Sequence, residues 1–176
     1  METEKSRHLD VGGLLYGELT GAVFLGLANA HPADDFCIAD ITANRVTEEI
    51  IPPNLLISSP RITRIPFPFL SIYRLDYPPG LFNDARMDMV LDLLQPDLLF
   101  KVLKEIRRCL KPGGRLAIVD EIGNKRIARM VSRLSRFREC ELLDTDQLLK
   151  SGYLLSLQSL SFLNAGHKLF LLRLAK

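Results

Sequence analysis

The sequence contains few of the residues that build metal centres and disulfide frameworks. Its three cysteines form no Cys-x-x-Cys pair, and its three histidines lack the spacing of metal ligands. We therefore expect reduced cysteines, a cytoplasmic location and no metal site. The longest apolar runs, residues 22–28 and 169–172, are far shorter than the ~20 residues of a membrane helix. Because no apolar segment follows the charged N-terminus directly, we expect neither a membrane span nor a signal peptide.

The composition that is present is that of one globular domain. Apolar residues make up 47% and charged residues 25% of the chain. A length of 176 residues is too short for two ordinary domains, so we expect a single domain over residues 1–176. The net charge of +2 hides an asymmetry: residues 1–100 carry 14 acidic and 7 basic side chains, whereas residues 101–138 carry 3 acidic and 12 basic ones. We therefore expect a basic region in the middle of the chain.

Short apolar runs that end in an aspartate recur along the chain. They span residues 8–10, 36–40, 70–76, 87–92 and 116–120. Runs of this length and composition, separated by longer segments, are typical of buried parallel strands joined by crossover connections. The sequence therefore predicts an α/β fold with three layers, in which helices cover a doubly wound, mostly parallel sheet.

Helical periodicity is strongest over residues 96–110, where apolar side chains recur every three or four positions. The sequence Lys111-Pro112-Gly113-Gly114 ends this pattern. Further helices are expected over residues 125–137 and 145–150, and a loop followed by a helix over residues 12–30.

The two remaining segments carry turn and breaker residues. Residues 154–162 and 168–174 are expected to form an antiparallel strand pair, because Asn164-Ala165-Gly166-His167 supplies a turn between them. Prolines recur from position 52 to position 68, which excludes a long helix and a central strand there. We expect residues 41–69 to form an irregular excursion with room for a short hairpin.

The aspartates at the predicted strand ends indicate a ligand site. In an open parallel sheet, ligands bind beyond the carboxyl ends of the strands, so these carboxylates would meet at one edge. Such an edge suits a ligand with hydroxyl groups and positive charge, and S-adenosylmethionine has a ribose diol, an ammonium group and a sulfonium. The alternative interpretation is that each aspartate caps the helix that follows its strand.

The segment Val102–Glu121, VLKEIRRCLKPGGRLAIVDE, resembles the helix–turn–strand unit of class I S-adenosylmethionine-dependent methyltransferases of the small-molecule type. In that family an amphipathic helix runs into Leu-Lys-Pro-Gly-Gly-Arg-Leu and then into an apolar strand. Residues 87–92 are similar to the family's fourth strand, and residues 146–175 to its closing antiparallel hairpin. The resemblance implies a Rossmann-like methyltransferase fold with S-adenosyl-L-methionine as cofactor.

The resemblance also implies a cofactor loop after the first strand. The family's loop reads acid-x-Gly-x-Gly-x-Gly, with glycines where the backbone approaches the methionine part of the cofactor. Asp10 and Gly12 match it, Gly13 and Gly17 lie close by, and Leu14 takes the place of a glycine. The alternative for these glycines is an ordinary strand-to-helix turn.

Acids and one aromatic residue complete the implied site. By the resemblance, Asp40 would bind the ribose hydroxyls, and Asp76 would lie near the adenine with Tyr77 offering a stacking face. Asp92 is counted with the cofactor-binding residues and would lie after the fourth strand, where the family commonly meets its methyl acceptor. No catalytic triad or dyad is visible, and none is needed, because alignment of donor and acceptor can supply most of the rate. The catalytic residues are therefore left unassigned.

Two functions stay open. The first is methyl transfer to an unidentified small-molecule or macromolecular acceptor. The second is a methyltransferase-like binding module that has lost the cofactor and serves a partner protein or RNA. Leu14 in place of a glycine, together with the proline-rich excursion, suggests this second function. An NAD-binding domain is disfavoured because Gly-x-Gly-x-x-Gly is missing.

A basic stripe marks the helix expected over residues 125–137. Its members recur at three- and four-residue spacing: Lys125, Arg126, Arg129, Arg133 and Arg136. The stretch 125–138 could be a solvated outer face of the protein. It could also bind an RNA backbone, an acidic partner protein or an anionic surface. No aromatic residue is interleaved with the stripe, so nucleic acid is a secondary hypothesis. The sequence leaves the oligomeric state open, as homo- or hetero-oligomer.

Overall fold

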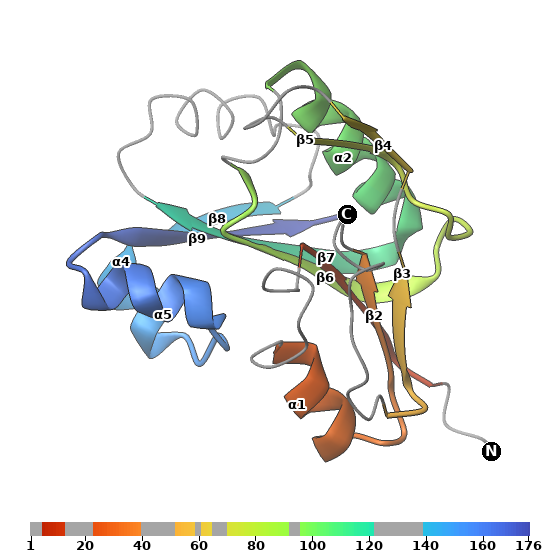
Figure 1. Cartoon of the computed structure of the whole chain (residues 1–176), viewed down its shortest axis with the longest axis horizontal. Coiled ribbons are helices and arrows are strands. Elements are labelled where there is room, and N and C mark those ends of the chain that lie inside the picture. Colours follow the sequence, from red (N-terminus) through yellow and green to blue (C-terminus); the bar gives the residue numbers. More distant parts are fainter. Residues whose placement is uncertain are drawn as a thin grey trace.

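The computed structural model describes residues 5–12, 23–39, 52–58, 61–64, 70–91, 96–121 and 139–176. Seven strands form one sheet in the order β3-β2-β1-β6-β7-β9-β8. In chain order they are β1 (Arg7–Val11), β2 (Asp35–Ala39), β3 (Leu55–Ser58), β6 (Phe82–Asp88), β7 (Leu110–Glu121), β8 (Glu139–Leu143) and β9 (Leu169–Ala175). β9 runs antiparallel to both of its neighbours, and the other described pairs in this sheet are parallel. Helices cover both faces, which confirms the predicted three-layer, mostly parallel α/β fold (Figure 1).

One face of the sheet is covered by α2 (Pro96–Cys109), as its periodicity predicts. Leu99, Val102 and Ile106 are buried. They belong to one apolar cluster with Met87 of β6 and Leu116 of β7. Burial of each such side chain stabilises the fold by about 1.5–3 kcal/mol, so this cluster anchors the centre of the sheet.

The segment 111–114 interrupts β7 close to its start. Leu110 already pairs with Phe82, and the ladder resumes with Arg115 opposite Asp84. Gly113 has a φ of +76°, and a Cβ atom at Gly114 would lie 2.9 Å from the nearest carbonyl oxygen. The two glycines are therefore required where the chain bends and passes close to its own backbone.

The opposite face carries α1 (Val23–Ala30), α4 (Thr145–Lys150) and α5 (Leu157–Asn164) (Figure 1). Phe24 of α1 packs on Phe36 of β2 with ring centroids 5.2 Å apart. Leu148 of α4 lies in a second cluster with Leu171 of β9. Between these two clusters the centre of this face carries charged side chains, among them Arg86 of β6.

The antiparallel C-terminal pair is confirmed, but its first strand is β8, so the strand predicted over 154–162 is wrong. Residues 157–164 form α5, which begins after Ser156, whose side chain accepts a hydrogen bond from the Ser159 N–H. β9 pairs with β7 on one side and with β8 on the other. A short apolar run fits a strand or a helix equally well, and the serine cap favours the helix.

The run 70–76 does not belong to the parallel sheet, contrary to prediction. β5 (Leu70–Arg74) pairs antiparallel with β4 (Arg61–Arg64) in a separate two-stranded sheet. Only residues 75–81 separate β5 from β6, whereas a crossover between parallel strands takes a dozen residues or more. β6 also begins and ends earlier than expected, so the acid at its carboxyl end is Asp88 and not Asp92.

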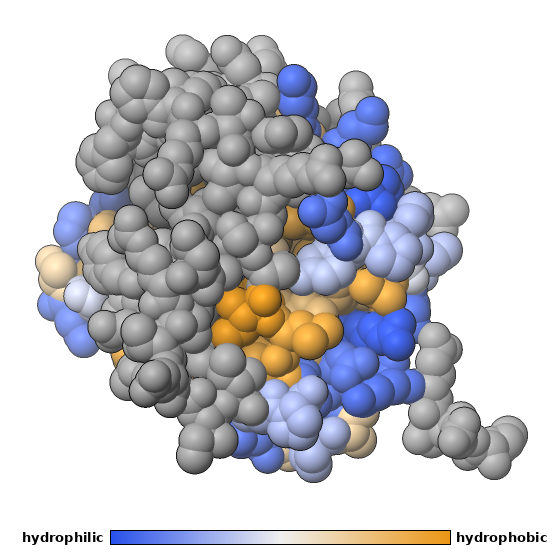
Figure 2. All heavy atoms as spheres, turned by 45° about the vertical axis from the view of Figure 1, so that its right-hand side comes forward, coloured by the Kyte–Doolittle hydropathy of each residue, from blue (hydrophilic) through white to orange (hydrophobic). Residues whose placement is uncertain are grey.

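The expected excursion contains two short strands. β3 forms an edge of the large sheet, a position where neighbouring prolines are tolerated, and β4 belongs to the small antiparallel pair that the prediction allowed. Leu56 of β3 is 58% exposed. On the side of the molecule that Figure 2 turns forward, an apolar area is bordered by hydrophilic residues.

The helix expected over 125–137, with its basic stripe, lies outside the described residues. Among the helices that are described, none is long and apolar enough to cross a membrane. The described part of the chain also brings no three potential metal ligands together.

Candidate cofactor-binding edge

The carboxyl ends of β1, β2 and β6 lie side by side. Asp10 of β1 stands opposite Ile38 of β2 and Arg86 of β6. Gly12 follows β1 directly, and its N–H donates to the carbonyl oxygen of Ala39 at 2.9 Å. The glycine turn therefore lies at the edge where an open parallel sheet binds its ligands.

Of the predicted site residues, the structure brings Asp10 and Gly12 to this edge. Gly13, Gly17, Asp40 and Asp92 lie outside the described residues. Asp40 comes directly after Ala39, the last residue of β2.

Asp76 and Tyr77 are not brought to this edge. Both precede β6 and lie by the C-terminal end of α2, where the Tyr77 carbonyl oxygen accepts a hydrogen bond from Arg108 Nη1 at 2.8 Å. The Tyr77 ring packs edge-on against Phe82 with centroids 5.0 Å apart, and Asp76 is exposed. The expectation that Asp76 ends a strand of the parallel sheet fails because β5 belongs to the small sheet.

A buried ion triad occupies the polar centre of the sheet. Arg86 Nε lies 3.3 Å from Asp10 Oδ2, and Arg86 Nη2 lies 2.6 Å from Asp88 Oδ2. Although burial alone would lower the pKa of Arg86, the nearby carboxylates raise it above its usual value. The Arg86 guanidinium thus bridges Asp10 of β1 and Asp88 of its own strand, which connects β1 to β6 close to the edge.

Asp88 also holds the start of α5. Its carboxylate accepts hydrogen bonds from the Ser156 N–H at 3.0 Å, the Ser156 hydroxyl at 3.0 Å and the Ser159 hydroxyl. Arg86 Nη1 donates to the Leu154 carbonyl oxygen at 3.0 Å. The chain before α5 is therefore attached to the middle of the sheet by one charged network, whose members strengthen one another at low dielectric.

Gly12 is required by the protein's own packing. Its φ is +86°, and a Cβ atom there would lie 2.5 Å from Val90 Cγ2. Val90 follows β6 and is buried. A glycine is thus needed both for the backbone conformation and for the close approach of Val90.

Asp120, near the end of β7, is committed to backbone groups. Its carboxylate accepts the Leu91 N–H at 3.0 Å and the Glu121 N–H at 2.8 Å. Leu91 follows β6 and Glu121 is the last residue of β7, so these contacts connect the ends of two neighbouring strands and are not the helix cap of the alternative interpretation.

The described part of the edge fits S-adenosylmethionine in one respect: Gly12 provides a turn with positive φ directly after β1 and beside β2.

Solved structures of similar fold identify this architecture. An S-adenosylmethionine-dependent methyltransferase from Aquifex aeolicus aligns with 97% of this chain and 83% of its own at 13% identity and a TM-score of 0.59. The 1,6-didemethyltoxoflavin-N1-methyltransferase of Burkholderia thailandensis, solved with S-adenosylhomocysteine, aligns with 98% and 71% at 14% identity and a TM-score of 0.60. The chain has the class I methyltransferase fold.

A third solved structure with the methyltransferase fold, a putative O-methyltransferase from Nostoc punctiforme, aligns with 99% of this chain but 53% of its own, at 13% identity and a TM-score of 0.63. No protein-family model and no curated protein matches the sequence. At such low identity the likeness establishes the fold, and the site chemistry has to be argued from this chain's own residues.

Sequence reasoning missed Arg86 and Asp88. The signal was present, because charged and apolar residues alternate through Asp84-Ala85-Arg86-Met87-Asp88. Such alternation predicts a strand with one polar face, whereas a strand covered on both faces reads as a continuous apolar run.

Proposed function

We propose that this chain is a methyltransferase that binds S-adenosylmethionine at the carboxyl edge of its sheet and transfers the methyl group to an acceptor. The supporting observation is the position of the Gly12 turn, which lies between β2 and β6 at the ligand edge of a methyltransferase fold. The bound cofactor would supply an activated methyl group. The protein's part would be to bind and align donor and acceptor, which can account for most of the rate.

In this proposal, different residues of the edge would bind different parts of the cofactor. The backbone from Gly12 to Gly17 would lie against the methionine part, and Asp40 would accept hydrogen bonds from the ribose hydroxyls. Asp10 would act through Arg86, holding the ends of β1 and β6 in place. No general base is assigned, because its need depends on the acceptor.

Calorimetric titration with S-adenosylhomocysteine tests the proposal. We expect micromolar binding that Asp40→Ala weakens at least about tenfold, as expected for loss of a charge-assisted hydrogen bond. Asp76→Ala is the matched control: it removes the same charge from an exposed position away from the edge and should leave the affinity unchanged. No heat and no thermal shift at millimolar ligand would contradict the proposal.

A binding module without cofactor is the second candidate, and two contacts favour it. The Asp10 carboxylate is paired with Arg86, and Val90 packs against Gly12. In both contacts, a residue of the predicted cofactor loop, Asp10 or Gly12, is engaged in the protein's own packing. If calorimetry detects no binding of S-adenosylhomocysteine, the next test is capture of a partner from native extract. The capture compares the wild type with a variant in which the basic stretch 125–138 is neutralised.

A further inference from the structure

A cavity of about 820 Å³ lies on the face of the sheet that carries α1 and α5. Two cross-strand rows form its floor: His8, Asp84 and Arg115 in one, and Arg86, Ala117 and Arg173 in the next. Its volume falls within the range of about 300–1,000 Å³ that is usual for small-molecule sites. His8 precedes the Gly12 turn by four residues of β1, so its row lies roughly 13 Å from the proposed cofactor edge. Arg86 stands opposite Asp10, so its row lies only about 7 Å from that edge.

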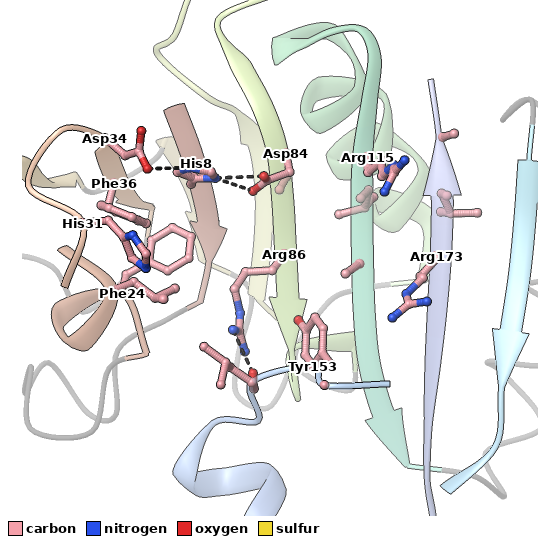
Figure 3. A pocket seen from close by; sticks show the side chains of 18 of the residues that line it. His8, Phe24, His31, Asp34, Phe36, Asp84, Arg86, Arg115, Tyr153 and Arg173 are labelled. Atoms are coloured by element: carbon pink, nitrogen blue, oxygen red, sulfur yellow. Dashed lines mark hydrogen bonds and ion pairs between the residues drawn. The ribbon is translucent and has the colours of Figure 1, made fainter. Parts of the chain in front are cut away.

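Two arginines form one end of the cavity (Figure 3). Arg115 of β7 pairs with Ala175 of β9, and Arg173 of β9 pairs with Ala117 of β7. Each arginine therefore has a small alanine as its cross-strand neighbour on this face. Arg115 is exposed and has neither an ion pair nor a hydrogen bond within the part of the chain that is described. Arg173 lies 3.3 Å from Glu141 with both side chains exposed, an arrangement that contributes little stabilisation.

The opposite end of the cavity is an apolar wall held in a fixed position. Phe24 and Leu27 of α1 and Phe36 of β2 line it. The His8 ring stacks on Phe36 with centroids 4.9 Å apart, and His8 Nδ1 lies 2.8 Å from Asp84 Oδ2. Three strand spacings separate Phe36 from the arginine end, roughly 14 Å, which leaves room for a ring between the wall and the guanidinium groups.

Tyr153 lies between Arg86 and Arg173, with its hydroxyl on the side of Arg86 (Figure 3). The guanidinium carbon of Arg86 lies 4.9 Å from the centroid of the Tyr153 ring. This hydroxyl is buried, and among the described residues it has no hydrogen-bond partner. Burial raises the pKa of Tyr153, so the group is a neutral donor at physiological pH. Because the hydroxyl is buried, Tyr153 contributes its ring to the cavity lining and leaves the binding of an anion to the arginines.

We propose that this cavity is a second ligand site, for a small aromatic anion. The phosphate or carboxylate of the ligand binds between Arg115 and Arg173, and its ring lies against the wall formed by Phe24 and Leu27. Arginine suits this task because its planar fork matches the oxygens of phosphate and carboxylate in pairs. The site requires no bound S-adenosylmethionine and stands apart from the proposed function.

Calorimetry with 1-naphthyl phosphate tests this site. We expect a Kd below about 1 mM for the wild type, with 1-naphthoate showing whether a carboxylate replaces the phosphate. Arg115→Ala should weaken binding about tenfold or more. Ala117→Leu keeps every charge but fills the floor, and should abolish binding while circular dichroism reports an intact fold.

The matched control is Lys104→Ala, which removes one exposed positive charge from α2 on the other face of the sheet. Its affinity for 1-naphthyl phosphate should equal that of the wild type. The proposal is overturned if the wild type binds nothing at about 10 mM, if Lys104→Ala and Arg115→Ala weaken binding equally, or if inorganic phosphate binds as tightly as 1-naphthyl phosphate. S-adenosylhomocysteine titrated into the same Ala117→Leu variant separates failure of this site from failure of the cofactor edge.

Discussion

Replacing Gly12 by alanine perturbs the turn at the end of β1 in two ways whose costs can be worked out separately. The φ of +86° lies in the left-handed region, which costs a residue with a Cβ about 1–2 kcal/mol. The new methyl group would lie 2.5 Å from Val90 Cγ2, and overpacking of this kind costs about 1–3 kcal/mol. Gly12→Ala should therefore lower the free energy of unfolding by roughly 2–5 kcal/mol.

Urea denaturation followed by circular dichroism measures this loss. Gly26→Ala is the control, because Gly26 lies inside α1 with nothing within 4 Å of the added methyl, and should gain about 0.5–1 kcal/mol. In the double variant with Val90→Ala the overlap disappears but the backbone strain stays, so the cycle should show a coupling of at least about 1 kcal/mol. A loss below about 0.5 kcal/mol for Gly12→Ala, or purely additive effects, would refute the packing described here.

Three further perturbations test other parts of the molecule. Arg86→Met leaves two buried carboxylates without their cation and should cost about 3–5 kcal/mol of stability in urea; a loss under about 1 kcal/mol would contradict the triad. The hydrogen bond with Asp84 raises the pKa of His8, so the folded state holds the proton more tightly than the unfolded chain. The free energy of unfolding should therefore be higher for the wild type than for His8→Asn, with the full difference present below the unfolded pKa of 6.5. This difference should decrease as the pH rises through the pKa of His8 in the folded state. A difference that does not change with pH would contradict the His8–Asp84 contact. A thiol reagent should modify the exposed Cys140 first and the buried Cys37, whose pKa is raised to about 11, only on unfolding; equal rates would be inconsistent with this burial.

The elements that could be predicted from sequence are those with a strong local pattern. The helix over residues 96–109 combines a wide apolar stripe with a proline at its start, and both signals act within a few residues. β2 and residues 116–119 of β7 are short apolar runs, which is typical of strands covered on both faces of a parallel sheet. For these elements, local preference and tertiary packing agree.

The errors occurred where the decision rests on distant contacts. Whether residues 157–164 become a strand or a helix depends on Ser156 reaching Asp88, a contact that spans 68 positions. Asp76 was placed at the ligand edge because its strand was assigned to the large sheet, and β5 instead pairs with β4. The alternation in β6 indicates one polar face, but the pairing of Arg86 with Asp10 depends on the register between β1 and β6, which no local pattern specifies. For Gly13, Gly17, Asp40 and Asp92, the cofactor role stays a prediction.

β9 is inserted between two strands that both precede it in the chain. β8 has no other partner among the described strands, and the free edge of β7 is likewise closed only by β9. A chain in which residues 169–175 are not yet paired therefore exposes two open strand edges together with the apolar side chains around them. We expect folding intermediates of this kind to be prone to aggregation until β9 completes the sheet.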